Sequence, residues 1–410
     1  MSPSPPRDDR PGPAALLAVL GGLVCQMGLG YNYVFGALAP DVIADFGWTK
    51  AEFAGARAPQ LWIMALASPL VGFLVIRFGA RVVLLCSTVL LGAAFLTLAR
   101  MDALWQLYAV LSFQALSVTG LGDITVGQLV SRWYRRHRGL ALGIVYTGSN
   151  LGGAILVRSA GLLSGPDAWR DIFQAMGGVA WFLMLPVAFW AVREPAEGGA
   201  VDGSAGEGGF DEDETSEGLG LAEALRTRSF WILAVALFAF FFYFVAILDH
   251  LVLHLTEQGF SRAEAQAHLS NAILLGMASK VGFGWIADRL PPTTSVALDF
   301  GLLAASSLLL LLPPVSFTVW TFVLVFGFSA AARDVVYPVI LSHCFGLRAM
   351  AEIYGALMLA LPAGALGAWF AASVSDRLGG YGAAFLTFAA LNVMTFIALL
   401  LVRDERRYST

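Results

Sequence analysis

Long, uninterrupted apolar segments recur along the chain, from residue 14 almost to the C-terminal end. Each is about 20 residues or longer, which is the length that an α-helix needs to cross the hydrocarbon core of a bilayer. Charged residues make up only 13% of the 410 residues, whereas a soluble domain carries about 25%. A transmembrane β-barrel would instead show short segments of alternating hydrophobicity. The chain is therefore predicted to be an all-α integral membrane protein.

Sliding hydropathy windows predict twelve transmembrane helices in this sequence. They cover residues 14–38, 53–76, 80–99, 104–130, 138–162, 171–192, 229–252, 263–287, 293–313, 316–342, 352–374 and 380–402. Between the sixth and seventh helices the chain becomes rich in Gly and acidic residues, and such a segment cannot bury enough apolar surface to fold. We therefore expect a disordered N-terminal tail (1–13), a six-helix half (14–193), an acidic flexible cytoplasmic linker (194–226), a second six-helix half (227–402) and a C-terminal tail (403–410).

The placement of basic residues predicts the orientation of the chain. Most of the 25 Lys and Arg residues fall in loops that share one side of the membrane, and that side is the cytoplasm by the positive-inside rule. Both termini are therefore expected in the cytoplasm, in a multi-pass protein of the inner (plasma) membrane. The net charge of −4 argues against a nucleic-acid partner, and we expect a functional monomer in the lipid bilayer.

Motifs for catalysis, metals and cofactors are missing from the sequence. It contains no Walker-type phosphate loop, no HExxH, no paired Cys ligands and no dinucleotide fingerprint. The three cysteines lie in or beside apolar runs, which does not indicate a disulfide framework. We expect no enzymatic activity, no cofactor and no metal site.

Charged residues inside the predicted helices are the first candidates for function, because a charge at the bilayer centre is costly. Lys280 lies well within the eighth predicted helix, where a lone ammonium facing a cavity would bind a carboxylate. The alternative is a structural ion pair with Asp249 or Asp334. Arg333 and Asp334 are adjacent in the tenth helix and point about 100° apart. Binding and structural roles are equally open for Arg333, and a structural role is favoured for Asp334.

Uncharged polar residues extend the candidate substrate site, and three ionisable residues are candidates for proton coupling. The predicted substrate-binding set is Lys280, Arg333, Tyr31, Asn32, Tyr146, Asn150 and Tyr337. His titrates near neutral pH, and a desolvated carboxyl can be brought into the same range. Asp249, His250 and Asp123 are therefore predicted proton sites, with solvation at the helix end or helix pairing as the alternatives. Arg57 is expected to anchor its helix at the membrane interface.

Two loops at equivalent positions of the two halves follow one pattern. The chain reads GFLVIRFGAR at 72–81, after the second helix, and GWIADR at 284–289, after the eighth. In both, a Gly permits close helix packing and a basic residue follows at the cytoplasmic face. The repeat indicates two six-helix pseudo-repeat halves. On this pattern the chain resembles the major facilitator superfamily, which implies the major facilitator fold.

Three further stretches resemble the monocarboxylate and oxalate/formate transporter branch of that superfamily, in its prokaryotic part. They are residues 30–52, 133–149 and 279–284. The resemblance places the substrate-binding cation of the branch, usually Arg, at Lys280. It implies a secondary active transporter of a small organic anion, a proton-coupled monocarboxylate symporter that works by alternating access. The alternatives are an organic anion exchanger of the oxalate/formate type and a transport-like membrane sensor. The exchangers carry a second basic residue in the eleventh helix, and residues 352–374 contain none.

Overall fold

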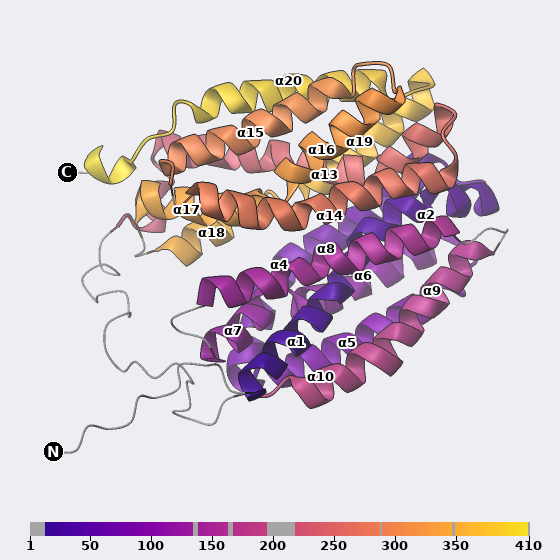
Figure 1. Cartoon of the computed structure of the whole chain (residues 1–410), viewed down its shortest axis with the longest axis horizontal. Coiled ribbons are helices and arrows are strands. Elements are labelled where there is room, and N and C mark those ends of the chain that lie inside the picture. Colours follow the sequence, from indigo (N-terminus) through magenta and orange to yellow (C-terminus); the bar gives the residue numbers. More distant parts are fainter. Residues whose placement is uncertain are drawn as a thin grey trace.

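A computed structural model of the chain describes residues 13–133, 138–162, 167–194, 218–287, 289–346 and 349–408. These ranges are built of helices, and the only extended pairing among them is one isolated bridge between Gly218 and Gly346. Figure 1 shows two helical bundles, one coloured indigo to magenta and the other salmon to yellow. The predicted all-α fold with an N-terminal and a C-terminal bundle is confirmed.

The N-terminal bundle contains the helices from α1 to α10. Their bounds are α1 Pro13–Met27, α2 Tyr31–Phe46, α3 Lys50–Gly55, α4 Arg57–Phe78, α5 Ala80–Leu98, α6 Leu104–Leu121, α7 Asp123–Trp133, α8 Arg138–Leu162, α9 Ala168–Val179 and α10 Leu185–Ala191. A 3₁₀ turn over Gly28–Gly30 joins α1 to α2, and a π-helical turn over Ala180–Met184 joins α9 to α10. Several predicted spans are thus two helices in series.

The C-terminal bundle contains the helices from α12 to α20. Their bounds are α12 Leu221–Ala224, α13 Arg228–Glu257, α14 Arg262–Ala287, α15 Pro292–Leu309, α16 Ser316–Ala330, α17 Arg333–Phe345, α18 Met350–Met358, α19 Ala363–Leu378 and α20 Gly382–Leu399. A short 3₁₀ helix, Glu405–Tyr408, follows. Residues 218–226, which the sequence places in the flexible linker, include α12, and the backbone N–H of Leu219 donates to the carbonyl of Phe345 at 2.8 Å. Residues 195–217 of that linker lie outside the described ranges.

In the described part of the chain, nine helices are long and apolar enough to cross a membrane. The count is ten if α16 and α17, bent by 42° relative to each other, form one broken span. The other two predicted spans correspond to α4 and α8, which have 22 and 25 residues. At 1.5 Å per residue both exceed the roughly 30 Å of a hydrocarbon core.

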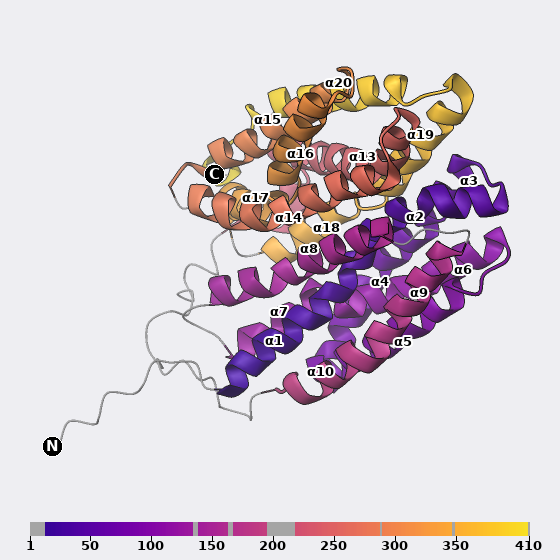
Figure 2. The same ribbon diagram turned by 45° about the vertical axis from the view of Figure 1, so that its right-hand side comes forward.

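The two bundles meet along α2 and α8 on one side and α13 and α14 on the other. Glycines allow part of this approach: a Cβ added at Gly36 of α2 would collide with the Leu248 carbonyl oxygen of α13. In Figure 2, α2 and α3 lie beside α13 and α19 at the end remote from the start of α1. The break between α16 and α17 places Arg333 and Asp334 at the start of α17, facing this interface.

Candidate functional site

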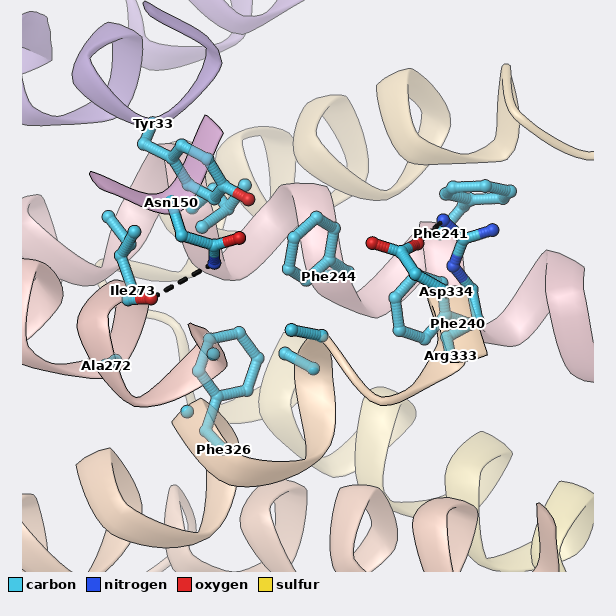
Figure 3. Close-up of a pocket in the computed structure, with 15 residues that line it drawn as sticks. Tyr33, Asn150, Phe240, Phe241, Phe244, Ala272, Ile273, Phe326, Arg333 and Asp334 are labelled. Atoms are coloured by element: carbon cyan, nitrogen blue, oxygen red, sulfur yellow. Dashed lines mark hydrogen bonds and ion pairs between the residues drawn. The ribbon is translucent and has the colours of Figure 1, made fainter. Parts of the chain in front are cut away.

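A cavity of about 120 Å³ lies between the two bundles. Tyr33 of α2 and Asn150 of α8 line it from the N-terminal side, and the remaining lining comes from α13, α14, α16, α17 and the α16–α17 break. Four aromatic side chains form much of its wall: Phe240, Phe241, Phe244 and Phe326. Figure 3 shows Asn150 and Tyr33 at one end and Arg333 with Asp334 at the other. The cavity is therefore an aromatic chamber with a polar group at each end.

Three charged side chains, here called the charge cluster, meet beside one end of this cavity: Arg333 and Asp334 line it, and Lys280 contacts Asp334 from outside the lining. The Lys280 Nζ lies 3.2 Å from the Asp334 Oδ2, and the Arg333 guanidinium is paired with the Asp334 Oδ1. Lys280 also donates to the Tyr146 carbonyl oxygen at 3.3 Å, which links α14 to α8 of the other bundle. With all three groups ionised, two cations share one carboxylate and the cluster carries a net charge of +1.

The surroundings of Arg333 fix its orientation. Its guanidinium carbon lies 5.3 Å from the ring centroids of both Phe240 and Phe241, which is within cation–π distance. The side chain of Asp334 is 38% exposed, whereas that of Lys280 is 9% exposed. The Asp334 carboxylate is thus the most exposed member of the cluster, and the side chains of its two cationic partners are more buried. The ion pair between Lys280 and Asp334, one of the alternatives from the sequence, is present.

Asn150 presents an unsatisfied acceptor at the opposite end of the cavity. Its side-chain Nδ2 donates to the Ile273 carbonyl oxygen at 3.1 Å. Because the amide nitrogen is used in this way, the Oδ1 faces the cavity, and this buried atom has no hydrogen-bond partner. Tyr33, which lines the cavity beside Asn150, was not in the predicted set. The sequence signal was its place one residue beyond the two residues that were chosen, Tyr31 and Asn32.

A second ion pair lies between the bundles, and neither of its members lines the cavity. The Arg57 Nη2 of α4 is 2.9 Å from the Asp249 Oδ1 of α13, and the side chains are only 3% and 1% exposed. Arg57 also donates to the side-chain and backbone oxygens of Asn32 at 3.1 and 2.6 Å, and lies over the Phe35 ring at 4.5 Å. The expectation that Arg57 anchors its helix at the membrane interface is wrong, because a carboxylate from the other half of the chain satisfies its charge inside the protein.

Further polar contacts join the two bundles around this pair. Lys50 of α3 is 2.5 Å from Glu257 of α13, and Arg262 of α14 is paired with Asp41 of α2. The Gln266 side chain donates to the Ala37 carbonyl oxygen at 2.8 Å. We call the end of the molecule that these contacts hold together, around Lys50, Arg57, Asp249 and Arg262, the closed end.

The other predicted site residues lie outside the cavity wall or outside the described part. The buried Tyr31 hydroxyl accepts a hydrogen bond from Gln60, and the buried Tyr337 hydroxyl donates to the Leu233 carbonyl oxygen. The His250 Nε2 lies 2.9 Å from the Ala368 carbonyl oxygen and its Nδ1 lies 3.2 Å from the Tyr381 hydroxyl. Asp123 is the first residue of α7, but its side chain is outside the described part.

One buried acid was missed by the sequence reasoning. Asp299 lies in α15 and is 2% exposed. It is the only charged residue in the predicted span 293–313, and that isolation within an apolar run is the signal that could have identified it.

Comparison with known proteins agrees with the fold. Residues 20–364 match the family model described as Major Facilitator Superfamily. The bovine Monocarboxylate transporter 13 is 24% identical over 87% of this chain and 81% of its own length. The Oxalate:formate antiporter of Oxalobacter formigenes is 25% identical over 93% of this chain and 88% of its own length.

Solved structures share the whole architecture. A bacterial homologue of the human lysosomal transporter Spinster, crystallised in an inward-facing and occupied conformation, aligns with a TM-score of 0.74. The alignment covers 96% of this chain and 97% of that protein at 14% sequence identity. The helical architecture and the family match, which extends over most of the sequence, lead to one conclusion: this chain is a transporter of the Major Facilitator Superfamily.

Proposed function

We propose that this protein is a secondary active transporter in the inner (plasma) membrane, and that it carries a small organic monocarboxylate together with a proton. The observation that supports this most directly is the charge cluster, in which two cations share one carboxylate beside the cavity between the bundles. Such a cluster has one positive charge in excess and attracts an anion. Relatives named monocarboxylate transporters and an oxalate:formate antiporter give independent support for an anionic substrate.

In this proposal the substrate carboxylate binds at the charge cluster. It reaches Arg333 from the cavity, which Arg333 lines, and Lys280 adds its positive charge from outside the lining, beside Asp334. Charge-assisted hydrogen bonds from an ammonium or a guanidinium to a carboxylate are about twice as strong as neutral ones. The phenylalanine wall covers the apolar part of the substrate, and the Asn150 Oδ1 offers an acceptor at the far end. The small cavity volume favours acids of a few carbon atoms.

Transport then requires the two bundles to rock around this site. With both termini in the cytoplasm, as the proposal has them, the closed end faces outward. The Arg57–Asp249 pair and the contacts around it must separate to admit substrate from outside. This is the alternating-access cycle expected of two pseudo-repeat halves with a binding site at their interface.

A proton completes the charge balance of the loaded carrier. An unpaired charge is expensive in a low-dielectric cavity, so an anion crosses most easily when a proton travels with it. Asp249, His250 and Asp123 remain candidates for this proton. Asp249 and His250 already have polar partners. A further acid without an ion-pair partner is therefore also a candidate for the proton.

The test is uptake of radiolabelled C2–C6 carboxylates by the purified protein in liposomes, with and without an inward proton gradient. We expect one or more monocarboxylates to accumulate above equilibrium only when the gradient is present. An organic anion exchanger, the alternative that the antiporter relative favours, would instead need a counter-anion inside and ignore the gradient. A membrane sensor would bind the acid without accumulating it, and either result would contradict the proposal.

A further inference from the structure

Asp299 is a buried acid that the proposed transport cycle has not yet used. It lies within α15 and is 2% exposed. Unlike Asp249 and Asp334, which both have ion-pair partners, it forms no hydrogen bond and no ion pair in the described part of the chain. An ionised carboxylate buried without a partner is strongly destabilising, and such a group is stable when it carries a proton.

The charges that face Asp299 belong to the substrate site. The helices packed against α15 are α14, α16, α17 and α20. From α17 come Arg333 and Asp334, one turn before Tyr337, whose ring centroid lies 6.4 Å from that of Phe300, the residue after Asp299. From α14 comes Lys280, which is joined to Asp334, whereas α16 and α20 contain no charged residue. A change in the charge of Asp299 therefore changes the electrostatic potential at the charge cluster.

The sum of these charges links the proton to the substrate. With Asp299 ionised, two cations and two carboxylates balance, and an anionic substrate would add an uncompensated negative charge. With Asp299 protonated, the cluster of Lys280, Arg333 and Asp334 keeps its net charge of +1, which one monocarboxylate neutralises. Each ligand is thus bound well only when the other is present, which is the condition for coupled transport.

We propose that Asp299 carries the coupling proton of this transport cycle. This rests on the proposed function. A proton from water on the loading side forms an O–H bond on the Asp299 carboxylate, and one substrate anion then binds the charge cluster. After the bundles rock, the anion and the proton both leave to water on the other side. The charge carried across the membrane is zero, and Asp334 stays ionised throughout.

The experiment compares the wild type, Asp299→Asn and a control in proteoliposomes. The amide mimics the protonated acid, so Asp299→Asn should retain counterflow of the same substrate but lose dependence on pH. One coupled proton gives up to about tenfold accumulation for each unit of pH gradient, and we expect the variant to reach a ratio of about one. Ser295→Ala is the matched control, because Ser295 is buried one turn earlier in α15 and, within the described residues, its hydroxyl donates a hydrogen bond only to the Pro291 carbonyl. It should accumulate substrate like the wild type.

An infrared measurement on the purified protein reads the protonation of Asp299 without any transport. With substrate bound, the wild type should show the carbonyl stretching band of a protonated carboxyl, and the part of this band that Asp299 contributes should be missing in Asp299→Asn. Uphill accumulation by Asp299→Asn at the wild-type ratio would overturn the assignment, and so would identical carboxyl bands in the two proteins. If the wild type itself accumulates none of the acids, the proposed function fails instead, and the coupling role of Asp299 fails with it.

Discussion

Two buried groups of charges lie between or beside the bundles, and they differ in composition, exposure and place. The pair of Arg57 and Asp249 contains one cation and one acid, spans the two bundles and is almost fully buried. The charge cluster of Lys280, Arg333 and Asp334 contains two cations and one acid from the C-terminal bundle, and its acid is 38% exposed. The charges of the first group sum to zero, whereas those of the three residues of the second sum to +1 when all are ionised.

This difference separates an ion pair that holds the bundles together, Arg57–Asp249, here called the lock, from a binding site. A buried pair with one cation and one acid has no net charge with which to attract a further ion. It does hold together the two helices that supply its members. A cluster with an excess charge and an accessible member is stabilised when a counter-ion enters. The same residue types therefore serve opposite purposes, and the ratio of cations to acids decides which.

The largest effect is expected when the lock is broken on one side. Asp249→Ala leaves Arg57 buried without its carboxylate, and removing one partner of a buried ion pair costs about 3–5 kcal/mol. The melting temperature of the purified protein should fall, and a cysteine introduced at the closed end should react faster with a membrane-impermeant thiol reagent.

The double variant Arg57→Leu/Asp249→Leu serves as the control for this lock. Replacing both members removes the stranded charge, so much of the lost stability should return. If Asp249→Ala melts like the wild type and leaves the closed end equally protected, the pair does not hold the bundles together.

A smaller effect is expected at the glycine that lets the bundles approach. A Cβ at Gly36 would overlap the Leu248 carbonyl oxygen across the interface, and overpacking of this kind typically costs about 1–3 kcal/mol. Gly36→Ala should shift the protein away from the closed arrangement, again measured by thiol labelling at the closed end. Gly72→Ala is the control, since no atom lies within 4 Å of the added Cβ. Equal labelling of the two variants would contradict this close approach.

The smallest effect is expected for the exposed pair at the same end. Lys50 and Glu257 are 2.5 Å apart, and their side chains are 19% and 40% exposed. Lys50 also donates to the Ser375 hydroxyl at 2.9 Å. Ion pairs that solvent reaches contribute about 0–1 kcal/mol. Lys50→Ala should change the melting temperature by little, and the change should shrink further in high salt. A loss comparable to that of Asp249→Ala would show that exposure does not separate these two pairs.

The sequence predicted the fold well because the signals for it are local. Apolar segments of helical length identify spans, and loops at matching positions indicate the repeat. The position of Lys280 within an apolar run likewise marked it as unusual. None of these inferences requires knowledge of which residues meet in space.

The contacts between the halves could not be predicted in the same way. Arg57 and Asp249 are 192 positions apart in the chain, and nothing local shows that they meet. Around the axis of α2, which follows the 3₁₀ turn at Gly28–Gly30, Tyr33 lines the cavity while Tyr31 and Asn32 contact Gln60 and Arg57. The bend between α16 and α17 similarly brings Arg333 to the cavity wall.

The central claim is that the spare positive charge of the cluster binds the substrate carboxylate, and the affinity of Lys280→Ala for the transported acid tests it most directly. Removal of one partner of a buried charge-assisted contact costs about 2–5 kcal/mol, so the affinity should fall at least about thirtyfold while the protein stays folded. Lys280→Arg should retain some transport with an altered substrate range, because the charge survives but its shape changes. A stable Lys280→Ala protein that binds the acid as tightly as the wild type would contradict the account.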